Sequence, residues 1–275
     1  GPALRAITMM HFVNTLDKYN YTLEDIYPFL EPTLLNRTSL VFSTEQELFE
    51  KIIYYDLQFV VDNWQRQSFD LWEELNGDHF FTSMMQLNSM RLGIEFLSHH
   101  LDWACPSGSS ISSFINTLNS TYTLIENFIQ KDAGFVDNLF NHIIENPQYK
   151  NKRSGLDIST LIATILTHDA VADTSNNTMP FNYNNTLVLN SLQGLSESMQ
   201  VLYPINHGLT PLNMGVSLGR YPEDVYNGNG ESEGNPWFLA TASGAQLLYG
   251  YSNMHLKGKM DLRVDVSIDE MNESF

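Results

Sequence analysis

Apolar side chains recur at the spacing of one helix face through most of this 275-residue chain. Residues 4–16 (LRAITMMHFVNTL) show the pattern first. The same period predicts further helices over residues 43–66, 79–99, 112–130, 135–144, 157–168, 186–202 and 235–251. Only residues 262–268 (LRVDVSI) alternate as a strand does, and that run is short. The pattern therefore predicts an all-α fold.

Start signals support two of these helices. Ser43 and Thr44, followed by Gln46 and Glu47, form two overlapping capping boxes. Pro236 stands where proline is favoured, in the first turn of the last helix. Long connections rich in Gly, Asn and Pro separate the helices at 169–185, 203–213 and 219–234. Connections of this length in an ordered domain are usually functional.

Composition narrows the classes of partner. The 32 acidic and 14 basic residues give a net charge of −18, which argues against nucleic acid or an anionic membrane surface as partner. No apolar run approaches the roughly 18 residues that a membrane helix needs. Cys105 is the only cysteine, so no internal disulfide can form. Nothing in the sequence calls for a metal or a cofactor.

Three motifs resemble functional sites but fail on context. GVSLG matches the nucleophile elbow around Ser217, yet no strand-like run precedes it and Pro222 follows closely. GNGESEG at 228–234 lacks the spacing of a phosphate loop, and its two glutamates would repel a phosphate. The pair His99-His100 has no metal-ligand spacing, so both histidines are expected at a helix end.

The stretch FDLWEELNGDHFF at 69–81 crowds three acids around one indole. If residues 70–74 begin a helix, Asp70 lies near Glu73 and Glu74 at helical spacing, and the two glutamates point about 100° apart. Repulsion and burial against Trp72 would favour the protonated form of one acid, which protonation of a leaving oxygen requires. A solvated acidic helix start explains the same residues equally well.

The second candidate stretch is GRYPEDVYNG…NPWF at 219–238. Arg220 offers a planar fork of donors for hydroxyl groups. Tyr221, Tyr226 and Trp237 offer flat apolar faces, which suit the C–H face of a sugar ring. An ordinary surface loop anchored by aromatic residues explains this pattern equally well.

These two stretches together resemble fungal glucoamylases of glycoside hydrolase family 15. GPALRA at the start, DLWEE-x-N-G-x-x-FF, and GRYPED-x-Y…GNPWFL match that family in order, from Gly1 to about Tyr251, and yeast members most closely. The resemblance implies an (α/α)6 barrel, incomplete here. Residues 1–275 would be a single segment of the catalytic domain with no starch-binding domain, monomeric when complete.

The resemblance also implies an activity and a set of roles. Single β-D-glucose units would leave the non-reducing ends of starch, glycogen or maltooligosaccharides, from α-1,4 and more slowly from α-1,6 bonds, with inversion. Glu73 would be the general acid, and Asp70 a member of the acidic motif that sets the local field. Glu74 would bind sugar beyond the cleavage point and Arg220 the glucose released. The residues expected to shape the pocket are Trp72, Tyr221, Asp224, Tyr226 and Trp237.

Two departures qualify the resemblance. The carboxylate that activates water in this family lies well downstream of NPWFL, so we expect the general base beyond Phe275. Substrate-binding positions upstream of GPALRA are also absent, which indicates the middle of a longer enzyme. A catalytically inactive carbohydrate-binding relative therefore stays open as an alternative, and an esterase using Ser217 as a distant one.

Asn-x-Ser/Thr sequences offer a weak indication of cellular route. They occur at Asn20, Asn36, Asn119, Asn176, Asn184 and Asn272. Chance alone explains most of them in a chain this rich in asparagine. They favour a secreted or vacuolar, N-glycosylated protein.

Overall fold

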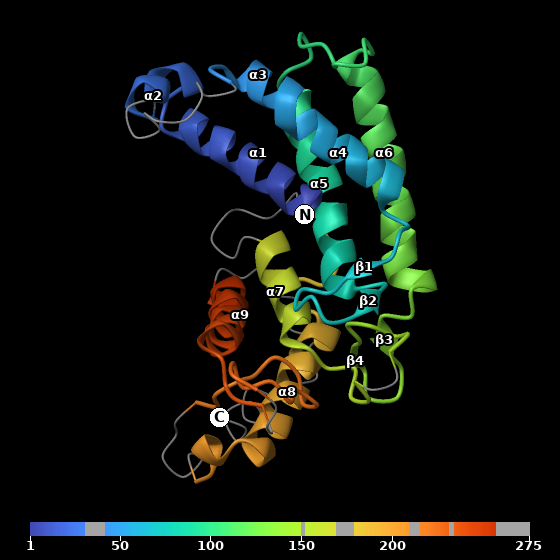
Figure 1. The fold of residues 1–275 in the computed structure, drawn as a ribbon, viewed down its shortest axis with the longest axis vertical. Helices are drawn as coiled ribbons and strands as arrows, with labels where there is room; N and C mark the ends of the chain where they lie inside the picture. Colours follow the sequence, from blue (N-terminus) through green and yellow to red (C-terminus); the bar gives the residue numbers. More distant parts are fainter. Residues whose placement is uncertain (31–41, 150–151, 169–178, 209–214, 231–233, 257–275) are drawn as a thin grey trace. The chain divides into compact units, whose positions relative to one another are not determined.

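The computed structural model describes residues 1–30, 42–149, 152–168, 179–208, 215–230 and 234–256 (Figure 1). These residues form two compact units, one from 1–66 with 85–128 and the other from 67–84 with 129–275. Helix α5 (Phe80–Ser98) contributes residues to both. Helices dominate the described part, as predicted.

The first unit is built from helices. They are α1 (Pro2–Lys18), α2 (Leu23–Leu30), α3 (Glu45–Leu48), the π-helical turn η2 (Phe49–Ile53), α4 (Tyr54–Asn63) and α6 (Ile111–Asn127). The predicted cap is present, since the Thr44 side chain accepts a hydrogen bond from the Glu47 amide. Helix α1 packs against α4, where the Arg5 guanidinium binds the buried Asp56 carboxylate through two hydrogen bonds of 2.7 and 2.6 Å.

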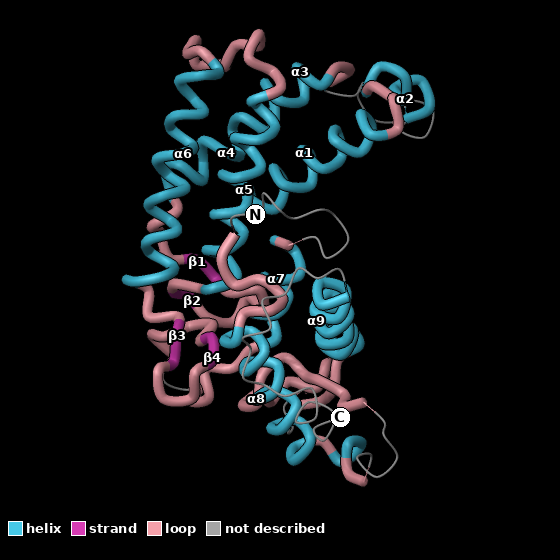
Figure 2. Tube along the Cα trace, turned by 180° about the vertical axis from the view of Figure 1, so that it is seen from behind, coloured by secondary structure: helices cyan, strands magenta, loops and turns pink. Residues whose placement is uncertain are grey.

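The second unit adds short strands and loops to its helices. Its elements are β1 (Ser68–Phe69), β2 (Asn76–Gly77), η3 (Phe128–Asp132), β3 (Val136–Asp137), β4 (His142–Ile143), α7 (Ile158–Thr167), α8 (Thr186–Leu202), η5 (Pro204–Asn206) and α9 (Phe238–Leu256). Helix α7 packs against both α8 and α9 (Figures 1 and 2). Strands β1 and β2 pair antiparallel, as do β3 and β4, so each pair is a small hairpin.

Seven of the eight predicted helices are present with nearly the expected bounds, and one prediction is wrong. Residues 135–144 form the β3–β4 hairpin instead of a helix. The Asp137 carboxylate accepts hydrogen bonds from the Leu139 and Phe140 amides, which closes a turn, and Asn141 adopts a left-handed φ of 55°. Turn chemistry therefore overrides the apolar spacing here. The predicted strand at 262–268 lies outside the described residues.

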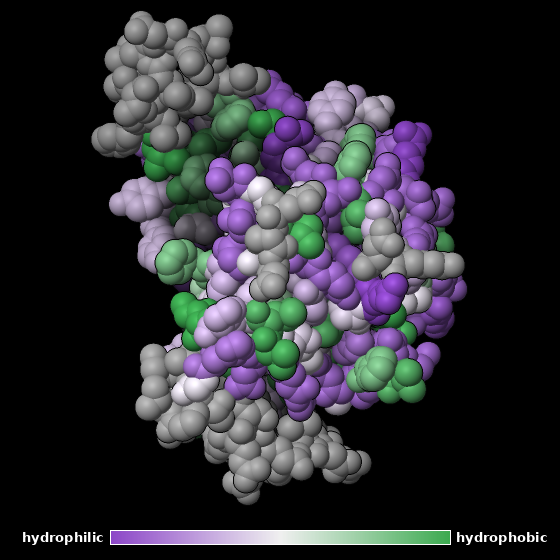
Figure 3. Space-filling model, turned by 60° about the horizontal axis from the view of Figure 1, so that its bottom comes forward, coloured by the Kyte–Doolittle hydropathy of each residue, from purple (hydrophilic) through white to green (hydrophobic). Residues whose placement is uncertain are grey.

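The surface agrees with the polar composition. Hydrophilic side chains predominate on the face shown in Figure 3, with apolar ones in small groups between them. The largest exposed apolar side chains of α9 are Phe238, Leu239, Tyr249 and Leu256. Within the described residues, no helix combines the length and hydropathy needed to cross a membrane.

Candidate active site

The acidic stretch forms a hairpin loop rather than the start of a helix. Residues 70–75 connect β1 to β2, and the Asp70 amide donates to the Leu75 carbonyl oxygen at 2.9 Å. Buried His79 contacts the backbone of the hairpin. Its Nε2 lies 3.0 Å from the Ser68 carbonyl oxygen and 3.1 Å from the Leu75 carbonyl oxygen. A Cβ at Gly77 would lie 2.6 Å from Asn146 Nδ2, so a larger residue there would displace that side chain. The expectation of a helix at 70–74 is thus corrected.

Asp70 holds this loop from inside. Its Oδ1 accepts hydrogen bonds from the Glu74 amide at 2.7 Å and the Leu75 amide at 3.1 Å. Asp70 is only 6% exposed, and its carboxylate binds the backbone of the loop. The expected role of Asp70 in setting the local field stays a prediction.

Glu73 and Glu74 have different environments although they are adjacent. Glu73 is exposed, has a left-handed φ of 60°, and its carboxylate receives no hydrogen bond from the described residues. Glu74 is bound on both oxygens: Arg220 Nη1 donates to Oε1 at 2.7 Å, and the Tyr221 hydroxyl donates to Oε2 at 2.6 Å. Glu73 is therefore the acid of the pair that is free to meet a ligand.

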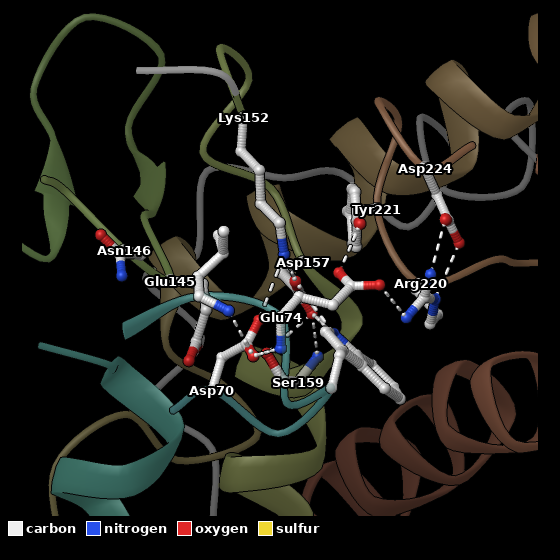
Figure 4. Close-up of polar contacts among 12 residues, drawn as sticks. Asp70, Glu74, Glu145, Asn146, Lys152, Asp157, Ser159, Arg220, Tyr221 and Asp224 are labelled. Atoms are coloured by element: carbon white, nitrogen blue, oxygen red, sulfur yellow. Dashed lines mark hydrogen bonds and ion pairs between the residues drawn. The ribbon is translucent and has the colours of Figure 1, made fainter. Parts of the chain in front are cut away.

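Arg220 is the centre of the second stretch (Figure 4). Its Nε and Nη2 donate to the two oxygens of Asp224 at 2.8 and 2.6 Å, while Nη1 reaches Glu74. Burial alone would lower the pKa of Arg220, but the hydrogen bonds and charges of Asp224 and Glu74 raise it overall. Its Cζ lies 5.3 to 5.4 Å from four ring centroids, those of Trp72, Tyr221, Tyr226 and Trp237. The guanidinium is thus fixed by two carboxylates and enclosed by aromatic faces.

Two glycines and a tyrosine shape the backbone around Arg220. A Cβ at Gly219 would lie 2.0 Å from the Tyr203 hydroxyl oxygen, so only glycine fits before Arg220. Gly234 has a left-handed φ of 72°, and a Cβ there would lie 2.7 Å from the Asp224 carbonyl oxygen. Burial, with the nearby charge of Asp224, raises the pKa of Tyr203 to about 12, so its hydroxyl stays protonated.

The structure joins the two predicted stretches. The rings of Trp72 and Trp237 lie 6.3 Å apart, and Tyr226 lies at the same distance from Trp237. Every residue expected at the site except Glu73 has a contact in this cluster, and Glu73 lies between Trp72 and Glu74 in the chain. Ser217, by contrast, lies in the irregular segment 215–219, and its amide donates to Asn206 Oδ1.

Buried residues that the sequence reasoning missed support this cluster. Asp157 is fully buried at the start of α7 and accepts hydrogen bonds from the Trp72 indole at 3.0 and 3.1 Å. Lys152 lies 3.1 Å from Asp157 and 3.6 Å from Asp70. Burial, and then the charge of Asp157, raises the pKa of Glu145 well above its usual value. The one signal in the sequence was Asp157 before an apolar helix, a typical N-cap.

No metal centre is formed by these acids. Within the described ranges, no group of three His, Cys, Asp or Glu side chains is placed to hold an ion. The carboxylates instead bind backbone amides, Arg220, Lys152 or the Trp72 indole. The arrangement suits acid–base and hydrogen-bonding chemistry on a polar ligand with an apolar face.

Comparison with known proteins gives consistent matches. Residues 1–269 match the sequence profile described as "Glycosyl hydrolases family 15". Glucoamylase S1 of Saccharomyces cerevisiae is 36% identical over 99% of this chain and 32% of its own length. The intracellular sporulation-specific glucoamylase of the same species is also 36% identical, over 99% of this chain and 45% of its own.

Solved structures agree with the sequence matches. The glucoamylase from Saccharomycopsis fibuligera superposes with a TM-score of 0.78 and 36% identity, covering 94% of this chain and 48% of that one. The glucoamylase structures matched are (α/α)6 barrels, so the predicted fold class is confirmed. The chain spans less than half the length of the curated relatives named here.

Proposed function

The chain belongs to glycosyl hydrolases family 15, and from that premise we propose that the protein is an exo-acting glucoamylase. It hydrolyses terminal α-1,4 and, more slowly, α-1,6 glucosidic bonds of starch, glycogen and maltooligosaccharides, as a monomer. It releases β-D-glucose with inversion and uses no cofactor. The observation that carries this proposal is the pairing of a free, exposed acid, Glu73, with the bound acid Glu74 in one fixed loop.

Glu73 protonates the glycosidic oxygen in this proposal. A general acid must lie within hydrogen-bond reach of the leaving oxygen and keep that position during the reaction. The hairpin meets the second condition, because Asp70 and His79 bind its backbone from the buried side. The exposed Glu73 carboxyl is available for the first, because no described side chain donates a hydrogen bond to it.

The Arg220 cluster binds the sugar. Glu74 keeps 32% of its side-chain surface exposed, so it can accept a sugar hydroxyl while Arg220 and Tyr221 hold it. Arg220 itself is 3% exposed, so it reaches a ligand only with the N–H groups that Glu74 and Asp224 leave free. Trp72, Tyr226 and Trp237 supply the apolar faces on which sugar rings stack.

Inversion requires a second carboxylate that activates water, about 6.5–9.5 Å from the acid. Asp224 is unsuited to this role, because both of its oxygens bind Arg220. Glu223 is unsuited as well, because its two oxygens accept hydrogen bonds from the Ser154 amide and hydroxyl. We therefore assign the general base to neither acid of this stretch.

We also propose a secreted or vacuolar route with N-glycosylation. Asn20 is the best acceptor of the described sequences: it is exposed and lies in the turn after α1 with a φ of 57°. Asn119 is a poor one, because it lies inside α6 and its side chain donates to the Ile115 carbonyl oxygen. Asn184 directly precedes the N-cap of α8.

Glucose release from maltose and soluble starch tests the proposed activity. The assay uses the full-length protein that contains these residues, with Glu73→Gln and, as an exposed-acid control, Glu197→Gln. We expect release by the parent and the control, loss with Glu73→Gln, and β-glucose appearing first by NMR. A folded parent that binds an acarbose-like inhibitor without releasing glucose would instead identify an inactive carbohydrate-binding relative.

A further inference from the structure

Lys152 is a buried cation beside the hairpin loop. Only 9% of its side-chain surface is exposed, and its Nζ lies 3.1 Å from Asp157 Oδ2 and 3.6 Å from Asp70 Oδ2. Both carboxylate side chains are at most 2% exposed. Buried carboxylates are costly unless a partner offsets their charge, so the ammonium group is required where it lies (Figure 4).

The two carboxylates belong to different elements. Asp70 Oδ1 holds the backbone of the hairpin loop, while its Oδ2 has no hydrogen-bond partner in the described part of the chain. Asp157 caps α7 and binds the Trp72 indole. The Lys152 ammonium is therefore the charged group that links the loop to the start of α7.

Lys152 also touches the sugar-binding side of the site. Its Nζ lies 3.5 Å from the centre of the Tyr221 ring, and the Tyr221 hydroxyl donates to Glu74. One ammonium thus contacts the supports of both Glu74 and the loop that carries Glu73. Glu145 is a third buried acid here, and burial, followed by the charge of Asp157, raises its pKa well above the usual value.

We propose that Lys152 is a positioning residue for the hydrolysis: it fixes the hairpin loop against α7 and Tyr221, so that Glu73 faces the glycosidic oxygen. The inference rests on the proposed function. Because Lys152 acts through Asp70, Asp157 and Tyr221, its loss affects the chemical step more than the binding of substrate. A displacement of about 1 Å in a catalytic group costs up to about 100-fold in rate.

The test compares Lys152→Met with Lys152→Arg in the full-length protein, using maltose as substrate. We expect Lys152→Met to lower kcat by at least about 10-fold while KM changes by less than about 3-fold. Lys152→Arg keeps the charge and should recover most of kcat. Lys131→Met, which removes an exposed lysine of the same unit, serves as the matched control.

A double variant separates positioning from folding. Lys152→Met with Asp157→Asn leaves no unpaired charge at Asp157, and Asn is an equally good N-cap. We expect this variant to fold, shown by a cooperative thermal transition at a higher temperature than that of Lys152→Met, yet to retain the low kcat. Parental kcat in Lys152→Met or in the double variant, or a folded Lys152→Arg no better than Lys152→Met, would overturn the inference. Failure of the parent itself to release glucose would overturn the proposed function, which is a separate result.

Discussion

Replacing Glu73 with glycine should stabilise the protein while it removes the activity. Glu73 has a left-handed φ of 60°, a conformation that costs an L-residue other than glycine roughly 1–2 kcal/mol. Glycine adopts this conformation freely. It also raises the conformational entropy of the unfolded chain, which lowers the stability of the folded state by about 0.4–1 kcal/mol. The exposed Glu73 side chain accepts no hydrogen bond from the described residues, so little else is lost. Glu73→Gly should therefore raise the free energy of unfolding by about 0.5–1 kcal/mol.

Two further variants isolate the backbone contribution. Glu73→Gln and Glu73→Ala keep a Cβ and therefore the same backbone cost, so their free energies of unfolding should stay within about 0.5 kcal/mol of the parent. All three variants lose the general acid, which should lower kcat on maltose by about 100- to 10,000-fold. Urea unfolding of the full-length protein gives the stabilities, and glucose release gives kcat.

The comparison between glycine and alanine decides the outcome. If Glu73→Gly is no more stable than Glu73→Ala, the left-handed conformation stores no free energy and the reasoning is wrong. If any of the three retains parental kcat, Glu73 is not the general acid. The two results are independent, because one concerns the backbone and the other the carboxyl group.

Three other changes test separate parts of the structure. Burial raises the pKa of Glu145 above its ordinary value of 4.5, so the folded protein holds a proton that the unfolded chain releases, and stability falls as pH rises above about 4.5. Glu145→Gln should therefore raise the melting temperature at pH 7 and leave it unchanged at pH 4; an equal effect at both would contradict this. Arg220→Lys cannot reproduce the bidentate bond to Asp224 and should lower kcat/KM on maltose at least about 10-fold, a loss that parental kcat/KM would refute. Asn20→Gln should remove one endoglycosidase-sensitive mass step on a gel when the protein is made in a secreting yeast, whereas Asn119→Gln should remove none; the reverse result would show that helix α6 is modified instead.

The helices could be predicted because their apolar period is strong, and the errors lie where local chemistry competes with it. Residues 135–144 have helical spacing, yet Asp137 closes a turn and β3 pairs with β4. Helix α2 was missed although Thr22 and Asp25 bind each other at its start, because Pro28 interrupts the pattern. In both places a few residues determine the local backbone conformation, and the apolar period does not.

The two local motifs of the site could be predicted, but the buried residues from other parts of the chain that support them could not. The motifs around Glu73 and Arg220 are read directly from the sequence because their residues are close together in the chain. The bond between Trp72 and Asp157 joins residues 85 positions apart, and no period or motif indicates such a pair. Lys152 and Glu145 look like surface residues in the sequence, since charged side chains are rarely buried without partners.

The buried support explains how an unfavourable backbone can persist at Glu73. The residue after it donates its amide to Asp70 at 2.7 Å, and the next one does so at 3.1 Å, so the chain is held immediately beyond the left-handed turn. The Asp70 carboxylate can stay buried there because Lys152 offsets its charge. Strain at a functional position persists only where the surrounding contacts fix it. The loop therefore presents Glu73 to solvent and Glu74 to Arg220 for one reason: two buried charges hold its backbone in a form that it would not adopt alone.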